Sequence, residues 1–461
     1  MNRLEIRRTS RVRLPTGSQP GWSRWTYAAL RGLLGPADMS LGKRNELKLY
    51  HEVVWAQGHG AAVQFHAPYA LHLGATNAEI GLLTSLPSLI ALLIGMPAGY
   101  WFSQQTNRGL WLGVTVFIHR LSLLLAAFIP FLSIDRPGAA MVLLIVIFSV
   151  PAHCFTLGWL PMLADVIPER NWGRVFAVRN ILTAFALTGG LFLVGSLLSM
   201  SAFPTNYQVM YLAAFGSSLV STFIIARVKA PAATSRPRGG LNIAPAALWV
   251  QVKEAATQQP DFVRIVVNTF AHAIGVWMVP PVYVLYYVRT LNASDSWIAL
   301  NVLLANLSPI IGYILAQRAV TRWGENLVLK LTVGVVGLYP LLVGLSPDLN
   351  LILVWTTLYS LIVSGWTLAH NNMMLKIAPA AQRTNYLAAY QTIMNFGAFV
   401  MPFVGIFLAE LFGFAAILIA GGILCLAGSS IFFWRPLQTA DNLFTLTGDG
   451  LQDALHPPTN K

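Results

Sequence analysis

Long windows without any charged side chain recur along the chain, and they restrict its possible folds more than any other feature of the sequence. Residues 180–226 and 411–434, for example, contain no Asp, Glu, Lys or Arg. About 20 apolar residues are enough to cross the hydrocarbon core of a membrane as a helix. Lipid offers backbone N–H and C=O groups no hydrogen-bond partner, so an open chain must cross as a helix. Strands of a membrane β-barrel would alternate apolar and polar residues, and these windows do not.

Composition excludes the main soluble alternative. Only 10% of the 461 residues are charged and 56% are hydrophobic, whereas soluble domains carry about 25% charged residues. We therefore predict an all-α membrane protein with twelve transmembrane helices. The predicted spans are 47–72, 78–103, 109–133, 138–164, 174–199, 205–228, 262–289, 295–319, 327–346, 349–376, 384–409 and 412–434.

The basic residues are distributed unevenly between the two sides of the predicted membrane protein. With twelve spans both chain ends lie on one side, and that side receives 27 of the 30 Lys and Arg residues. The other side has only Arg136 and Arg289, and Arg120 falls inside the third span. Cytoplasmic loops carry an excess of Lys and Arg, so we expect a multi-pass protein of the inner or plasma membrane with both termini cytoplasmic. The net charge of +13 then reflects topology, and we expect no nucleic-acid partner.

Two sequence patterns recur at nearly the same offset. Residues 165–177 resemble 377–388 at an offset of 211, and residues 96–109 resemble 309–324 at 213–215. Six-plus-six repeats place a binding site between the halves, near the middle of the membrane. We therefore expect two pseudo-symmetric six-helix bundles joined by a linker, with a tail at each end. The expected boundaries are a basic cytoplasmic N-terminal tail at 1–46, the bundles at 47–228 and 262–434, a cytoplasmic linker at 229–261 and a cytoplasmic C-terminal tail at 435–461.

This organisation resembles the major facilitator superfamily of secondary transporters over about residues 45–435, without indicating a subfamily. The loop from Gly99 to Gly109 keeps the glycine and Arg108 of the family's signature between helices 2 and 3, but has Ser103 in place of the aspartate. The resemblance implies a central cavity lined by helices 1, 4, 7 and 10. It also implies that Arg108, Asp165 and Arg174 form a cytoplasmic gating network of charge-assisted hydrogen bonds. The alternative is that these three are ordinary charged residues of the cytoplasmic loops, which follow the positive-inside rule and have no gating role.

The first span contains three ionisable side chains at seven-residue spacing, namely Glu52, His59 and His66. Seven residues are almost two helical turns, so the three side chains lie along one face. Ionisable groups inside a membrane are costly and usually functional, and histidine changes charge near neutral pH. We predict a proton or substrate path along this face. The alternative is a polar helix buried inside the bundle.

Other spans that would line the cavity by resemblance also contain polar or ionisable residues. These additional candidates for substrate or proton binding are His153, Asn268, His272, Trp366, His370 and Asn371. The alternative for each histidine is a hydrogen-bonded packing residue. For Arg120, a charge deep in the third span, we predict an internal structural pair, with contact to an anionic substrate as the alternative. Pro280 and Pro281 should break the seventh span, because proline lacks a backbone donor.

These features predict a secondary active transporter that moves a small solute by alternating access and is coupled to protons. The alternatives are a receptor or sensor with a transporter fold, or a polytopic membrane enzyme without transport. The sequence contains no HExxH, GxSxG or phosphate-binding GxxxxGK[ST] motif and no paired carboxylates, so we predict no enzymatic activity. Its two cysteines, Cys154 and Cys425, form no metal-binding motif. We expect a small-molecule substrate, protons and the lipid bilayer as partners, no metal or cofactor, and a monomer.

Overall fold

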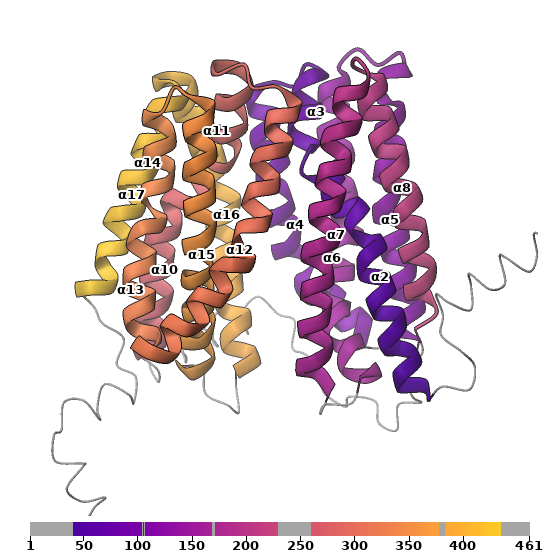
Figure 1. Cartoon of the computed structure of the whole chain (residues 1–461), viewed down its shortest axis with the longest axis horizontal. Helices are drawn as coiled ribbons and strands as arrows, with labels where there is room; N and C mark the ends of the chain where they lie inside the picture. Colours follow the sequence, from indigo (N-terminus) through magenta and orange to yellow (C-terminus); the bar gives the residue numbers. More distant parts are fainter. Residues whose placement is uncertain are drawn as a thin grey trace, which may run out of the picture.

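The computed structural model describes residues 40–167, 171–228, 260–377 and 383–434, apart from residues 104 and 106. Within these ranges the chain is helical and contains no strand. The predicted C-terminal tail, most of the predicted N-terminal tail and all of the predicted linker except its last two residues, 260 and 261, lie outside the described residues. Figure 1 shows the helices as two bundles standing side by side.

The N-terminal bundle provides six spans. Its first span is split into two helices by a turn at Gln64 and Phe65 that the sequence pattern did not predict. The helices are α2 (Leu41–Val63), α3 (His66–His72), α4 (Asn77–Ser103), α5 (Arg108–Phe128, continued by the short helix Ile129–Phe131), α6 (Pro137–Val166), α7 (Trp172–Met200) and α8 (Thr205–Ala226).

The C-terminal bundle also provides six spans, two of which are interrupted. As predicted, Pro280 and Pro281 divide the seventh span, because α10 ends at Met278 and α11 begins at Pro280. The helices are α10 (Pro260–Met278), α11 (Pro280–Leu285, continued by the π-helical turn Tyr286–Thr290), α12 (Asp295–Trp323), α13 (Glu325–Val336), α14 (Leu338–Leu345), α15 (Leu349–Ile377), α16 (Arg383–Phe412) and α17 (Phe414–Trp434).

Among the described residues, eleven helices are long and apolar enough to cross a membrane. Each corresponds to a predicted span. The remaining span is α2, whose 23 residues are long enough to cross but include Glu52 and several charged residues near its start. The all-α membrane fold is confirmed, and the structure is consistent with twelve spans. Helix α2 begins at Leu41, six residues before the predicted start.

The packing repeats between the bundles. Helix α2 packs against α7 and α8, and α10, the first helix of the other bundle, packs against α16 and α17. Helices α7 and α16 begin 211 residues apart, which is the offset of the sequence repeat. The bundles meet through two main helix pairs, α4 with α16 and α7 with α12.

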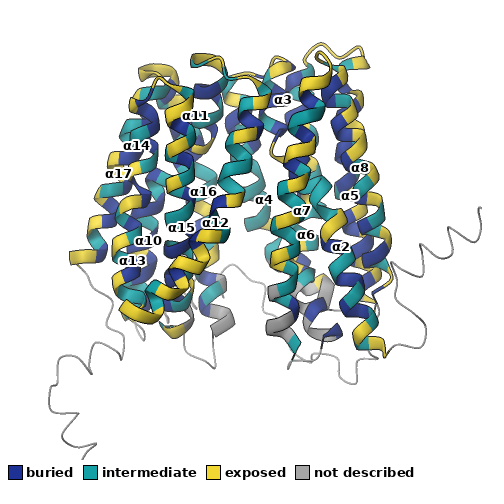
Figure 2. Ribbon diagram, in the orientation of Figure 1, coloured by how far each residue is buried: buried dark blue, intermediate teal, exposed yellow. Residues whose placement is uncertain are grey.

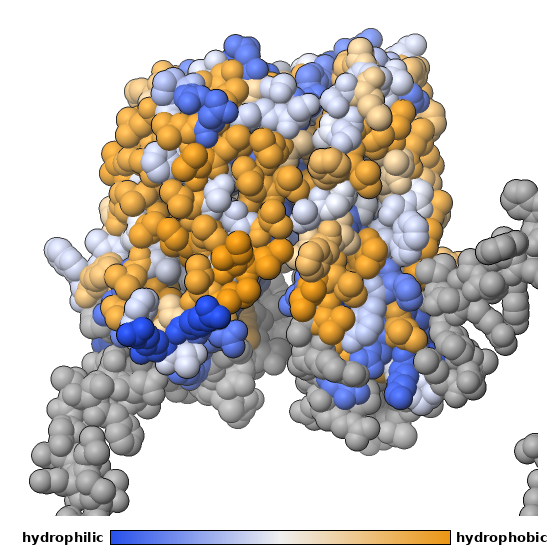
Figure 3. All heavy atoms as spheres, viewed as in Figure 1, coloured by the Kyte–Doolittle hydropathy of each residue, from blue (hydrophilic) through white to orange (hydrophobic). Residues whose placement is uncertain are grey.

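The outer surface is apolar. On α7, Phe185 is 72% exposed and Phe192 is 68% exposed, and many exposed positions of Figure 2 coincide with hydrophobic atoms in Figure 3. Soluble monomers rarely expose contiguous apolar patches of more than a few hundred Å². Lipid contact therefore explains this surface.

The bundles differ in how closely they approach at their two ends. We call the end where α2 begins and α17 ends the basic end, and the opposite end, with α3 and α11, the far end; they are the lower and upper ends in Figure 1. Figure 3 shows the visible face hollowed between the bundles toward the basic end. Polar contacts between the bundles lie at the far end: Arg289 donates to Asn77 Oδ1 (2.5 Å) and to the Ala75 carbonyl (2.7 Å), and His72 Nε2 lies 3.0 Å from Asp295 Oδ1.

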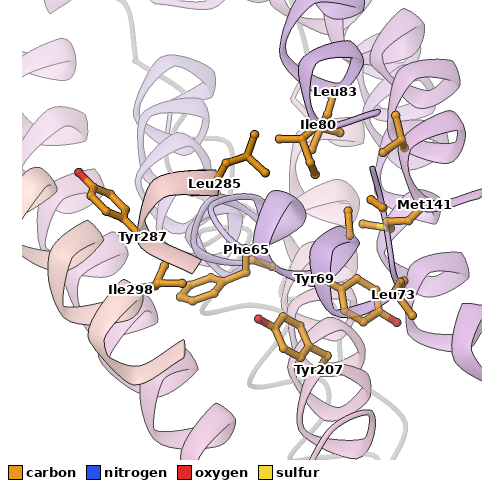
Figure 4. Close-up of a cluster of buried hydrophobic side chains, with 14 of the residues drawn as sticks. Phe65, Tyr69, Leu73, Ile80, Leu83, Met141, Tyr207, Leu285, Tyr287 and Ile298 are labelled. Carbon is orange, nitrogen blue, oxygen red and sulfur yellow. The ribbon is translucent and has the colours of Figure 1, made fainter. Parts of the chain in front are cut away.

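An apolar cluster continues the contact at the far end. It contains Phe65 and Tyr69 of the N-terminal bundle and Leu285 and Ile298 of the C-terminal bundle, all buried. Figure 4 shows these side chains coming from the helices of both bundles. We call this cluster together with the contacts of Arg289 the far-end seal. The structure is therefore closed at the far end and hollowed toward the basic end.

Close helix packing inside a bundle gives a first prediction. An added Cβ at Gly275 on α10 would collide with the Gly421 carbonyl oxygen of α17 and approach Cys425 N to 2.7 Å. We expect Gly275→Ala to destabilise the protein by about 1–3 kcal/mol. Gly334→Ala on α13 is the control, because a Cβ there meets nothing within 4 Å, and it should be neutral or stabilising by up to about 1 kcal/mol. Thermal unfolding in detergent measures both, and equal effects of the two substitutions would contradict this packing.

Candidate functional site

A buried charge network joins four helices of the N-terminal bundle. Glu52 on α2 accepts from the Arg179 guanidinium of α7, with Oε2 at 3.1 and 3.2 Å from the two nitrogens. Arg179 also donates to the Leu49 carbonyl at 2.6 Å, and its guanidinium stacks over the Trp159 ring at 4.5 Å. The Glu52 side chain is 3% exposed and that of Arg179 is 12% exposed. Charges so poorly solvated persist only when they are paired.

A serine connects this ion pair to Arg120. The Ser221 hydroxyl of α8 donates to Glu52 Oε1 at 2.9 Å and accepts from Arg120 at 2.9 Å. Arg120, on α5, also donates to the Ser218 carbonyl and to Thr222 Oγ1, both at 2.7 Å. The guanidinium is thus held between α5 and α8 by groups of the same bundle. This geometry favours the predicted structural pairing over substrate contact.

Two histidines contact each other between α2 and α5. His59 Nε2 lies 2.8 Å from His119 Nε2, and His119 Nδ1 lies 2.9 Å from the Phe148 carbonyl of α6. A carbonyl only accepts, so His119 carries its proton on Nδ1 and its Nε2 is an acceptor. His59 therefore donates from Nε2, which leaves His59 Nδ1 as the acceptor nitrogen of a neutral ring. That atom is buried and has no hydrogen-bond partner among the described residues.

The other two predicted histidines of this bundle lie apart from that pair. His66 is on α3, where its Nδ1 lies 2.9 Å from the Tyr211 hydroxyl, and it is 6% exposed, beside the far-end seal. His153 lies on α6 and is half-buried. The predicted face of the first span therefore divides into a charge network at Glu52 and a histidine pair at His59, both on α2, and a packing contact at His66 on α3.

The candidates in the C-terminal bundle form a buried polar cluster. His272 Nδ1 lies 2.9 Å from Ser429 Oγ and 3.2 Å from Cys425 Sγ. His370 Nε2 lies 2.9 Å from Thr269 Oγ1, and its ring stacks on Trp366 with 4.9 Å between centroids. Both histidines are at most 3% exposed. In this conformation their geometry favours the packing alternative.

The remaining candidates are two asparagines, which differ in solvent exposure, and three residues whose side chains the structure does not describe. Asn268 is fully buried, whereas Asn371 is exposed. The gating network proposed from resemblance, Arg108, Asp165 and Arg174, falls on side chains outside the described part of the structure. Within the described part, no three His, Cys, Asp or Glu side chains gather as a metal site requires.

A known protein family resembles this chain in sequence, and solved structures resemble it in fold. The sequence profile of the Major Facilitator Superfamily matches residues 265–451. The fold resembles a mutant of the nucleoside transporter NupG with a TM-score of 0.65 over 85% of this chain and 99% of that chain, at 12% identity. The sequence match to this superfamily thus lies in the C-terminal part of the chain, and the fold of the whole chain resembles that of a solved transporter. The family match, the fold and the eleven apolar helices together indicate a multi-pass membrane protein with a transporter fold.

Other solved transporters share this fold. A bacterial homologue of the human lysosomal transporter Spinster, in an inward-facing and unoccupied conformation, gives a TM-score of 0.61 at 13% identity, over 87% of this chain and 97% of that chain. A D-xylose–proton symporter gives 0.59 at 14% identity, over 86% and 97%. Such low identities show the fold alone. No curated protein matches the chain significantly in sequence.

Two residues that sequence reasoning did not single out complete these contacts. His119 precedes Arg120 in the third span, and it could have been found as another ionisable side chain inside the membrane. Arg179 was counted with the cytoplasmic loop before the fifth span. It lies almost two turns inside α7, which begins at Trp172, and its partner Glu52 is 127 residues away. No sequence signal pairs them.

The charge network gives a second prediction. Glu52→Gln leaves the buried guanidinium of Arg179 without its counter-charge, which should cost about 3–5 kcal/mol of stability. The double variant Glu52→Gln/Arg179→Gln should be less destabilised than the sum of the two single variants. Arg264→Gln is the control, because its ion pair with Asp261 is half-exposed and should be worth about 0–1 kcal/mol. Unfolding measurements in detergent test this, and strictly additive effects of the two substitutions would contradict a direct pairing.

Proposed function

We propose that this transporter works by alternating access, that its basic end faces the cytoplasm, and that transport is coupled to protons. The observation that carries the proposal is the asymmetry between the two ends. The bundles are sealed together at the far end by Arg289 and the apolar cluster, and the surface is hollowed between them toward the basic end. In this view the structure represents the state open to the cytoplasm.

The orientation follows from charge. The loops at the basic end belong to the side that receives 27 of the 30 Lys and Arg residues of the sequence. Such loops stay in the cytoplasm. The predicted tails and linker, residues 1–46, 229–261 and 435–461, would then also be cytoplasmic.

The contacts between the bundles suit a rocking movement. The far-end seal combines apolar packing with a few hydrogen bonds at the surface, and each of these hydrogen bonds contributes only about 0.5–1.5 kcal/mol. The network of Glu52, Arg179, Ser221 and Arg120 instead ties α2, α5, α7 and α8 to one another within a single bundle. The N-terminal bundle can therefore turn as a unit about its contacts with α12 and α16.

The histidine pair supports proton coupling. His59 Nδ1 is an acceptor with no described partner, so it can take a proton while Nε2 continues to donate to His119. The resulting imidazolium would be costly inside the bundle. Proton binding would thus favour a conformation in which this nitrogen reaches water or the substrate, and this preference is what couples a proton to bundle movement.

A transport experiment tests the function. A thermal-shift screen of purified protein identifies a ligand, and its uptake is then measured in proteoliposomes with and without an imposed pH gradient. We expect uptake that the gradient accelerates. In His59→Gln we expect loss of gradient-driven accumulation with exchange of substrate retained, and in the control His51→Gln, on the same helix, no change. Ligand binding without flux would instead identify a receptor, and uptake indifferent to the gradient would remove proton coupling.

The seal gives a prediction that needs no substrate. Removing the hydrogen bonds of Arg289 across the bundles should cost the closed far end about 1–2 kcal/mol. Such a cost multiplies the population that is open at the far end by roughly 5–30. We expect Arg289→Ala to accelerate labelling of Leu285→Cys by a maleimide added from the far side, in a background with Cys154→Ala and Cys425→Ala.

Another far-end arginine provides the matched control. Arg136 pairs with Glu79 at 2.6 Å, but both residues belong to the N-terminal bundle. Arg136→Ala should therefore leave the labelling rate of Leu285→Cys unchanged. Equal labelling rates in the Arg289→Ala and Arg136→Ala variants would contradict the role of the seal.

A further inference from the structure

A groove of about 400 Å³ lies among α12, α13 and α15, outside the candidate site described above. Its wall is formed by Leu315, Leu361, Ile362 and Val328. At the basic end of α12 the groove meets Arg318, Arg322 and Trp323. Known small-molecule sites of proteins span roughly 300–1,000 Å³, so the groove is large enough for part of a ligand.

Small residues make the groove possible. Gly312 brings α12 close to α15, because an added Cβ would collide with the Leu361 carbonyl oxygen. Gly365 forms part of the lining, where a Cβ would approach Thr332 Cγ2 to 2.9 Å. From Trp323 to Gly312 the groove follows α12 for about 16 Å at 1.5 Å per residue. It therefore extends from the membrane surface into the hydrocarbon region.

The two arginines lie four residues apart on one face of α12 and are exposed. Neither guanidinium makes an ion pair with any carboxylate in the described part of the chain. The nearest acid in sequence, Glu325, is already paired with Lys376 at 3.0 Å. Trp323 is 53% exposed, as expected of a side chain at the level of lipid headgroups. Figure 3 shows hydrophilic atoms gathered at this end of the C-terminal bundle, below a broad hydrophobic surface.

We propose that this groove binds an anionic phospholipid of the leaflet at the basic end. Its phosphate would lie between Arg318 and Arg322, and one acyl chain would follow the apolar wall toward Gly312. The charges of Arg318 and Arg322, which no described carboxylate pairs, supply the complementarity for the phosphate. The apolar wall of the groove would contact the acyl chain of the lipid. A free phosphate has no acyl chain and would leave the groove unfilled. This inference depends on the membrane location and not on transport, so its failure would leave the proposed function intact.

Native mass spectrometry of the full chain in detergent tests the site with phosphatidylglycerol and phosphatidylcholine of identical acyl chains. Near a membrane surface each Lys or Arg contributes about 1 kcal/mol of attraction to anionic lipid. We therefore expect Arg318→Gln/Arg322→Gln to bind phosphatidylglycerol about thirtyfold more weakly than the wild type. Phosphatidylcholine binding should be weak in both proteins. Arg318→Lys/Arg322→Lys should recover most of the affinity, because the charges remain.

The matched control is Arg227→Gln/Arg264→Gln, which removes the same charge from the basic end without touching the groove. It should bind phosphatidylglycerol as the wild type does. Equal losses in both glutamine variants would mean a diffuse charge effect and would overturn the site, as would equal binding of the two lipids by the wild type. Soluble glycerol 3-phosphate should fail to displace the lipid. Displacement by millimolar glycerol 3-phosphate would show that the acyl chain does not occupy the groove, and would overturn that part of the proposal.

Discussion

Hydrocarbon neither hydrogen-bonds a backbone nor solvates a charge, and the rest of this structure depends on that constraint. The backbone responds by forming helices throughout the described spans. Charged side chains respond by finding partners inside a bundle. Arg120 and Arg179, both in the N-terminal bundle, share the carboxylate of Glu52. Arg179 contacts it directly, and Arg120 is linked to it through the Ser221 hydroxyl. The same groups that make the charges tolerable tie four helices into one body.

Contacts inside a bundle and contacts between the two bundles have different roles. In the proposed movement the contacts between the bundles break and re-form, while those inside each bundle persist. The far-end seal combines one arginine with an apolar cluster, and toward the basic end the surface between the bundles is hollowed. The histidine pair lies inside the N-terminal bundle, between α2 and α5. A positive charge gained at His59 would therefore destabilise this conformation of the N-terminal bundle.

The sequence predicted the parts of the fold that depend on local physics. Hydropathy located the spans, and Pro280 marked the break between α10 and α11, because a missing backbone donor acts locally. The turn at Gln64 and the division of the ninth span at Gly337 were not predicted, although a proline that lacks a backbone donor, Pro68 or Pro340, follows each of them within four residues. The offset of the internal repeat predicted the matching positions of α7 and α16.

The candidate site was less predictable, because it depends on contacts between distant residues. Spacing placed Glu52 and His59 on one face of α2, but it could not show that Glu52 would meet Arg179 or that His59 would meet His119. For His272 and His370, composition left open whether they face a cavity. The structure buries both histidines with hydrogen-bond partners. These partners are brought together by tertiary packing, which no local sequence pattern indicates.

The central claim is that the two bundles move as bodies, so that only one end is open at a time. Pulsed electron paramagnetic resonance on the protein in lipid nanodiscs tests it most directly. One pair of spin labels spans the far end at Thr76 and Thr290, and a second pair spans the basic end at Leu110 and Thr321. The account predicts two distances for each pair, with the fraction that is long at the basic end equal to the fraction that is short at the far end. A single distance at both ends, or fractions that vary independently, would contradict it.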